Sequence, residues 1–141
     1  MVKQELKAFI AMSRALNEIN RNTISIVKEY GISTSQFAVL EALYHKGDLT
    51  VGEVQEKILS TSGTIAVVIR NLENSGLIYK TQDSNDKRRY ILKLSDKGLD
   101  LIAKVYPKNE KMLLSVMSSL NQDELNNLLL YMKRLTGYNH T

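Results

Sequence analysis

Apolar residues recur every three or four positions along most of the chain, which is the spacing of one face of an α-helix. From Leu6 to Val27 nothing interrupts this pattern, and the first breaker is Gly31, so the sequence predicts one long N-terminal helix. Three later segments begin with a capping box, in which a Ser, Thr or Asn precedes Gln or Glu by three positions. The pairs are Ser33 with Gln36, Thr50 with Glu53, and Asn121 with Glu124. Each pair predicts the start of a helix.

Two more helices follow from the same periodicity. The segment 60–76 starts with serines and threonines and ends at Gly76. Its apolar face consists of Ile65, Val68, Ile69 and Leu72. Ser95 is placed to cap a further helix, whose pattern is disturbed at Pro107, so a kink or a break is predicted there. The last helix is expected to end near Gly137.

Alternating, β-branched and aromatic residues predict a β-hairpin between the fourth and fifth helices. Its strands are "LIYKTQ" (77–82) and "YILKL" (90–94), joined by the polar loop "DSNDKRR" (83–89). Two short helices, a third with a polar outer face and then a basic hairpin form the order of a winged helix-turn-helix. The predicted fold class is therefore mainly α (α+β), a winged helix-turn-helix with additional N- and C-terminal helices.

The terminal helices carry apolar stripes that a three-helix lobe cannot cover. These stripes include Leu6, Ile10, Leu128, Leu129, Met132 and Leu135. We expect a homodimer, because a second copy of the chain is the simplest cover, and a two-fold axis would set two recognition helices about 34 Å apart. The prediction is one domain over residues 1–141, with dimerisation helices at 1–30 and 98–141 and a winged helix-turn-helix DNA-binding lobe at 33–95.

Charge is concentrated in the hairpin. The chain has 19 Lys and Arg against 15 Asp and Glu, a net charge of +4. Residues 80–93 contribute +3 of this net charge, because they contain five cations and only two acids, Asp83 and Asp86. The cations are Lys80, Lys87, Arg88, Arg89 and Lys93. Cations that neutralise phosphates release counterions, so this loop favours double-stranded DNA as a partner; a merely solvated turn is the alternative.

Several other function classes are disfavoured by what the sequence lacks. It has no cysteine, which excludes disulfides and cysteine metal sites, and His45 and His140 belong to no ligand or catalytic cluster. It also has no nucleophile–base pair or glycine-rich phosphate loop, so we predict no enzyme, cofactor or metal. No apolar run approaches the roughly 18 residues of a membrane span, and the N-terminus is amphipathic, which predicts a cytoplasmic protein without a membrane partner.

Two motifs carry a resemblance to a known family. The hairpin and the residues after it fit an Asp-x-x-Asp-Arg/Lys-Arg run followed by Leu-Thr/Ser-x-x-Gly, at Asp83, Asp86, Lys87, Arg88, Leu94, Ser95 and Gly98. The fourth helix ends in Leu-Glu-x-x-Gly-Leu, at Leu72, Glu73, Gly76 and Leu77. On these motifs the chain resembles the MarR family of bacterial transcriptional regulators over essentially its whole length. It is most similar to the branch that responds to quinones and related phenols.

The resemblance implies a homodimeric repressor of a pseudo-palindromic operator, released by a small, aromatic effector. In the family that effector usually binds where the dimer helices meet the DNA-binding lobe. Two departures from the family pattern limit how far the roles of family residues can be assigned to this chain. Ser84 stands where proline is frequent, which implies a looser turn, and Val67 stands where many relatives have a polar or basic residue, so base preference does not carry over.

The candidate site has two parts. In the recognition helix it comprises Ser60, Thr61, Ser62, Thr64, Val67 and Arg70, and in the wing Asp86, Lys87, Arg88 and Arg89. Alternatives stay open for several of them: the serines and threonines are also ordinary helix caps, and Arg88 with Asp86 is also an ordinary surface ion pair. Val67 would touch a thymine methyl group, and Arg70 is either in the groove or solvated.

The main alternative function is a winged-helix protein-interaction module, in which the basic hairpin docks an acidic partner without specific DNA binding. Specific binding to DNA upstream of the coding region, in the presence of excess unrelated DNA, would separate the two.

Overall fold

The computed structural model describes residues 1–58 and 62–137, and its contacts divide the chain into two compact units. The first unit is Met1–Asn109 and the second is Glu110–Thr141. Helices dominate, and one small antiparallel sheet accompanies them, which confirms the predicted fold class. The elements in chain order are α1 (Gln4–Lys28), α2 (Thr34–Lys46), β1 (Leu49–Thr50), α3 (Val51–Ile58), α4 (Ser62–Asn74), β2 (Ile78–Gln82), β3 (Tyr90–Leu94), α5 (Asp96–Met117) and α6 (Gln122–Thr136).

The three predicted capping boxes are all present. In each, the cap side chain accepts a backbone N–H three residues on, and the side chain of that later residue accepts the N–H of the cap. The bond lengths lie between 2.8 and 3.2 Å for the pairs Ser33 with Gln36, Thr50 with Glu53, and Asn121 with Glu124. These bonds satisfy amide donors that a helix leaves open at its start, and they fix where α2, α3 and α6 begin.

Two features differ from the sequence prediction. Helix α5 is continuous through Pro107, so of the kink or break predicted there the break does not occur. Tertiary packing outweighs the one backbone hydrogen bond that proline removes. Close to the proline, Asn109 is buried, and its Oδ1 accepts a 2.9 Å hydrogen bond from the Thr23 hydroxyl of α1. The second difference is the two-residue strand β1, which was not predicted.

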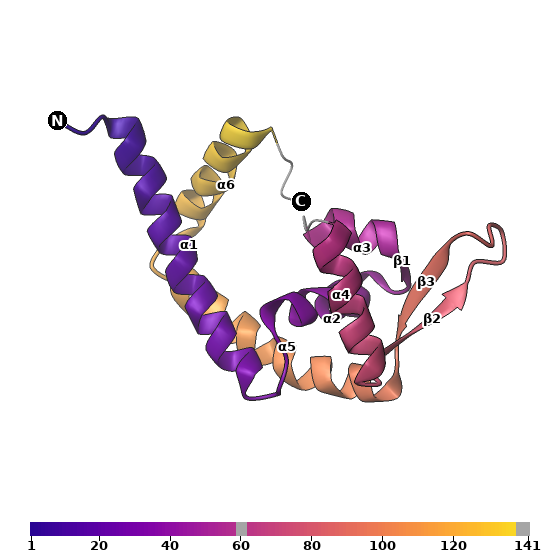
Figure 1. Cartoon of the computed structure of the whole chain (residues 1–141). Coiled ribbons are helices and arrows are strands. Elements are labelled where there is room, and N and C mark those ends of the chain that lie inside the picture. Colours follow the sequence, from indigo (N-terminus) through magenta and orange to yellow (C-terminus); the bar gives the residue numbers. More distant parts are fainter. Residues whose placement is uncertain (59–61, 138–141) are drawn as a thin grey trace. The chain divides into compact units, whose positions relative to one another are not determined.

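The sheet has the strand order β1-β3-β2. Strands β2 and β3 form the predicted antiparallel hairpin, with Ile78 opposite Leu94 at one end and Gln82 opposite Tyr90 at the other. Strand β1 joins the free side of β3, with Leu49 opposite Leu92. The hairpin extends outward beside α3 and α4 (Figure 1) and carries the basic loop at its tip.

The core of the first unit lies between α2, α3, α4, α5 and the sheet. Its fully buried side chains come from six elements: Val27 of α1, Val39 and Leu40 of α2, Val54 of α3, Ile65 and Leu72 of α4, Leu92 of β3, and Ile102 and Val105 of α5. Together they form one hydrophobic cluster, so α4 and the hairpin pack on the same core.

The turn between α4 and β2 is fixed against the start of α5. The Ser95 hydroxyl donates to the Gly76 carbonyl at 2.6 Å, and the Ser95 amide donates to the Leu77 carbonyl at 3.1 Å. The same hydroxyl accepts the Gly98 amide at 3.0 Å, which confirms Ser95 as the cap of α5. Gly98 is buried against Leu77 so closely that a Cβ at this position would collide with the Leu77 carbonyl oxygen.

We predict that Gly98→Ala lowers the free energy of unfolding by about 2 kcal/mol or more, because the added methyl group must push backbone apart. The matched control is Gly52→Ala, whose Cβ would meet only the Thr50 Oγ1 at 4.0 Å. Ala is the better helix former, so the control should gain up to about 1 kcal/mol. Urea unfolding followed by circular dichroism measures both. Equal stability of the two variants would show that the Gly98 contact is not tight.

Candidate nucleic-acid interface

The loop at the hairpin tip is braced by short-range hydrogen bonds. The Asp83 amide donates to the Arg89 carbonyl at 2.9 Å, and the Asn85 amide donates to Asp83 Oδ1 at 2.9 Å. The Gln82 side-chain amide crosses the loop and donates to the Lys87 carbonyl at 2.8 Å. The loop therefore has a defined conformation although Ser84 replaces the proline frequent in the MarR family.

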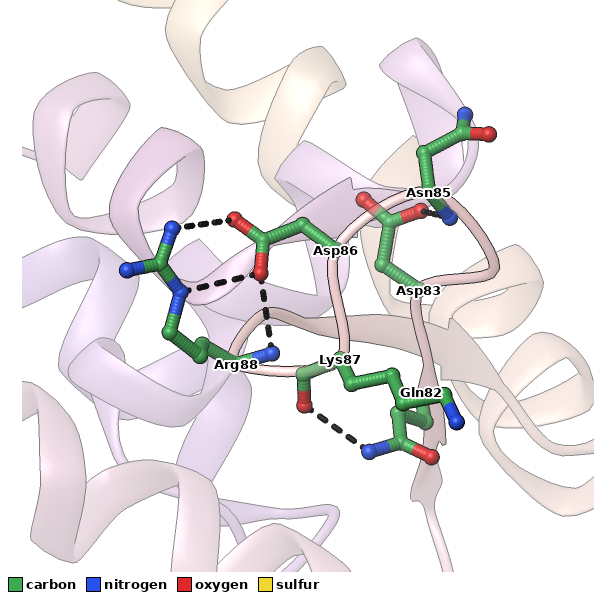
Figure 2. A network of polar contacts seen from close by, with 6 residues as sticks. All are labelled: Gln82, Asp83, Asn85, Asp86, Lys87 and Arg88. Atoms are coloured by element: carbon green, nitrogen blue, oxygen red, sulfur yellow. Dashed lines mark hydrogen bonds and ion pairs between the residues drawn. The ribbon is translucent and has the colours of Figure 1, made fainter.

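Arg88 and Asp86 form a two-pronged ion pair within this loop (Figure 2). Arg88 Nε donates to Asp86 Oδ1 at 3.1 Å, and Nη2 donates to Oδ2 at 3.2 Å. The Arg88 backbone amide also donates to Asp86 Oδ1, at 3.0 Å. A guanidinium group has five N–H donors, and two are used here, so three remain directed away from Asp86.

The Asp86–Arg88 pair orients a cation more than it stabilises the fold. The Arg88 side chain is 90% exposed, and pairs at such sites contribute little to stability. Hydrogen bonds from the Arg88 side chain, and then from its backbone, hold the pKa of Asp86 below its ordinary value. The carboxylate therefore stays ionised near neutral pH, and the guanidinium is presented in a fixed plane with donors free for an anion such as phosphate.

Two cations at the base of the hairpin have structural partners. Lys80 Nζ lies 3.4 Å from Glu73 of α4 and 5.6 Å from the centre of the Tyr90 ring. Lys93 Nζ lies 3.2 Å from Asp48, just before β1. These ion pairs connect the hairpin to α4 on one side and to the residue before β1 on the other.

Lys87 and Arg89 give the tip of the hairpin its excess of positive charge. Within residues 1–58 and 62–137, no carboxylate lies within ion-pair distance of the Lys87 ammonium group. Arg89 acts at longer range on the carboxylates of Asp86 and Glu53 and helps to lower the pKa of both. Arg89 and Glu53 also line one open cavity of about 610 Å³ between the start of α3 and the hairpin. The sequence did not predict Glu53 as a neighbour of the hairpin, because only the tertiary fold brings α3 close to β2 and β3.

On α4 the predicted residues occupy the side opposite the core. At 100° per residue, Val67 and Arg70 point away from the buried Ile69 and Leu72, and both are exposed. Thr64 is exposed at the margin of this face. The exposed Asn71 and Asn74 belong to the same outer surface. They were missed by sequence reasoning, although their spacing from Val67 gives the signal.

The remaining recognition-helix predictions concern residues at the start of α4. Ser60 and Thr61 lie outside the described residues, and Ser62 is the first residue of α4. Which of these residues cap the helix and which face a partner stays a prediction.

No metal cluster or membrane-spanning helix is found in the described part of the chain. There, no three His, Asp or Glu side chains are grouped as a metal ion would require. No helix over the same residues is long and apolar enough to cross a bilayer.

Comparison with known proteins gives a consistent result. The sequence model of the MarR family matches residues 32–90, from the residue before the α2 cap to the first residue of β3. The HTH-type transcriptional regulator MhqR of Bacillus subtilis (strain 168) is 32% identical over 135 residues, which cover 96% of this chain and 93% of that protein.

Solved structures show the same fold at lower sequence identity. AbsC, a MarR family transcriptional regulator from Streptomyces coelicolor, superposes with a TM-score of 0.89 at 15% identity, covering 97% of this chain and 95% of AbsC. MepR of S. aureus in a complex with DNA superposes with a TM-score of 0.80 at 22% identity. The match covers 97% of this chain and 98% of MepR.

We predict that the Asp86 carboxyl group titrates below its ordinary pKa of 3.8, and that Arg88→Ala raises this pKa by removing its hydrogen-bond donors. Because the pKa is lowered in the folded state, the pair is complete above the ordinary value and is lost as the pH falls through the lowered one. Carboxyl ¹³C NMR measures the titration. Arg89→Ala should raise the pKa less, since Arg89 acts by charge alone. An Asp86 pKa that Arg88→Ala leaves unchanged would contradict the pairing.

Proposed function

Since the chain belongs to the MarR family of transcriptional regulators, we propose that it is a homodimeric repressor that binds a pseudo-palindromic operator. In this proposal α4 enters the major groove, and the hairpin β2–β3, which we call the wing, reaches the neighbouring backbone or minor groove. The observation that carries the proposal is the Asp86–Arg88 pair, because it fixes an exposed guanidinium at the tip of a basic hairpin beside α4.

The two parts of the site have different physical roles in this proposal. Arg88, Lys87 and Arg89 act on the phosphate backbone, where each cation that neutralises a phosphate adds affinity without regard to sequence. The outer face of α4 carries Val67 and Arg70, with Thr64 at its margin. An exposed valine offers a contact for a thymine methyl group, whereas arginine pairs best with guanine or phosphate. Specificity then comes from α4 and a large part of the affinity from the wing.

Dimerisation is supported by apolar side chains that each unit leaves exposed. In α1 they are Leu6, Phe9, Ile10, Met12, Leu16 and Ile24, and in the second unit Leu114, Val116, Leu129, Leu130, Tyr131 and Leu135. Monomeric soluble proteins rarely leave large apolar surfaces in water, so these exposed side chains favour a partner that covers them. We propose that the terminal helices of two copies cover each other and so fix the spacing of the two α4 helices.

A small, aromatic effector completes the proposal. It releases the operator if it binds more tightly to a conformation whose recognition helices are wrongly spaced, since a ligand shifts an equilibrium only by its differential affinity. The chain has no cysteine, so sensing by thiol oxidation or thiol modification is excluded.

The dimer is tested by sedimentation velocity at micromolar concentration, where we expect one dimeric species. Ile10→Asp and Leu135→Asp should each shift the equilibrium toward monomer, because a charge replaces an exposed apolar contact. Val67→Asp is the matched control, since Val67 is a similarly exposed apolar residue of α4 outside the terminal helices. A folded monomer in the wild type would remove the basis for binding two half-sites.

The wing is tested with Arg88→Ala in electrophoretic binding to DNA upstream of the coding region, competed by excess unrelated DNA. Affinity should fall, and the slope of log affinity against log salt should shrink by about one per protomer if Arg88 neutralises a phosphate. Arg21→Ala is the matched control. It also removes an exposed arginine held by a carboxylate, Glu18 at 3.1 Å, but on α1.

The wild type, Arg88→Ala and Arg21→Ala could instead have equal affinities and equal salt slopes while all remain dimeric. That result would show that the basic loop is only a solvated turn. Binding that unrelated DNA fully competes away would instead favour the protein-interaction module.

A further inference from the structure

The open cavity of about 610 Å³ beside the hairpin is lined by acids as well as by the arginines of the wing. One wall is the start of α3, which carries Glu53 and Glu56, and the other is the end of the loop, which carries Arg88 and Arg89. Two carboxylates and two guanidinium groups give these four side chains a net charge of zero. The arginines proposed to bind phosphates therefore share one cavity with carboxylates, which repel phosphates.

Strand β1 fixes the start of α3 against the hairpin. Thr50 pairs with Ile91 of β3, and the same Thr50 forms the capping box with Glu53 through bonds of 3.0 and 3.2 Å. Glu53 therefore cannot leave the hairpin without breaking the cap of α3. Its Oε1 accepts the Thr50 amide, and a carboxylate has two acceptor oxygens, so Oε2 remains for a cation. Val54, the next residue, is fully buried and holds this turn of α3 on the core.

Glu53 attracts Arg89 across the cavity without a direct ion pair. Hydrogen bonds with Thr50, first of its backbone and then of its side chain, lower the pKa of Glu53, and the positive charges of Arg89 and Lys57 lower it further. No ion pair within residues 1–58 and 62–137 includes Glu53, Glu56 or Arg89. Charges are felt over roughly 10 Å at 0.1 M salt, so this attraction acts through solvent. Arg89 is exposed and thus stays accessible to another anion.

The acids of α3 differ from Asp86 in how they act on the wing. Asp86 belongs to the loop and moves with Arg88, so that ion pair enters a complex intact. Glu53 and Glu56 belong to a helix that is anchored on the core, and they stay in place when the wing meets an anion. A phosphate that approaches Arg89 therefore also approaches two fixed negative charges. Like charges repel, so each of these carboxylates lowers the affinity of the arginines for phosphate.

We propose that Glu53 and Glu56 compete with DNA phosphates for Arg88 and Arg89, and so lower the affinity of the wing for DNA of any sequence. This inference rests on the function proposed above. Because every sequence has the same phosphate backbone, the two acids weaken specific and non-specific complexes by the same factor. The wing alone then holds DNA weakly, and a stable complex needs the base contacts of α4 as well.

The competition is tested with Glu53→Gln and Glu56→Gln in binding to a random-sequence duplex, followed by fluorescence anisotropy. Each variant should bind about threefold more tightly than the wild type, with a larger gain at lower salt, because one repulsive charge is removed. Binding to DNA upstream of the coding region should rise by the same factor. Glutamine keeps the cap of α3, since Gln36 fills the same role in the Ser33 capping box with a bond of 2.8 Å.

Glu124→Gln is the matched control. Glu124 is also the glutamate of a capping box, with Asn121, but it belongs to α6 in the second unit. This variant changes the total charge and the capping chemistry in the same way as Glu53→Gln, and its affinity for the random duplex should equal that of the wild type. An equal gain for Glu124→Gln would overturn the proposal, because total charge alone would explain it. Glu56 lies outside the capping box of α3, so Glu56→Gln decides the question even if Glu53→Gln unfolds the lobe.

A double-mutant cycle tests whether Glu53 acts through Arg89. In an Arg89→Gln background the gain from Glu53→Gln should fall from about threefold to below about twofold, because the carboxylate has lost a cation for which it competes. An undiminished gain would overturn the competition, as would equal affinities of the wild type, Glu53→Gln and Glu56→Gln for the random duplex. A wild type without preference for the upstream DNA would refute the proposed repressor, whereas the random duplex would still decide the role of the two acids.

Discussion

The contact on which the positions of α4 and the hairpin both depend is the one between the start of α5 and the turn that joins α4 to β2. Ser95 and Gly98 meet the backbone of Gly76 and Leu77 there, with hydrogen bonds of 2.6 and 3.1 Å and with no space for a side chain at Gly98. This turn ends α4 and begins the hairpin. Because both elements leave one fixed turn, the orientation of the helix and that of the wing are set together, and neither can move without disturbing α5.

Charge in the hairpin serves two different purposes. At its base, Lys80 and Lys93 are used for structure, since each is paired with a carboxylate of a neighbouring element. At its tip, the Asp86–Arg88 pair is so exposed that it adds little stability, yet it restricts a long side chain to one orientation. In the proposed complex with DNA, ordering Arg88 before binding spares part of the conformational entropy that a free arginine would lose. The same basic segment is thus an anchor at its base and, in the proposed function, a binding surface at its tip.

How much could be predicted from the sequence depended on the distance between the interacting residues. The capping boxes, the hairpin and the pairing of Asp86 with Arg88 were predictable, because each involves residues close together in the chain. Strand β1 was missed, since its two residues become a strand only by pairing with β3. A kink or a break was predicted at Pro107, and the break does not occur for a related reason: local chemistry disfavours a helix there, whereas the packing of α5 against α1 maintains it.

The contacts at the α4–β2 turn differ in how easily they can be broken. Gly98 is buried against Leu77 and cannot shift without opening the core. The Ser95 bonds are short and close to the backbone, so they are costly to replace. The bond from Lys97 to Ser75 is made by a flexible, exposed side chain to a neutral acceptor. It is therefore the contact at this turn that can be lost with the least change to the core, and it lies just after the last residue of α4.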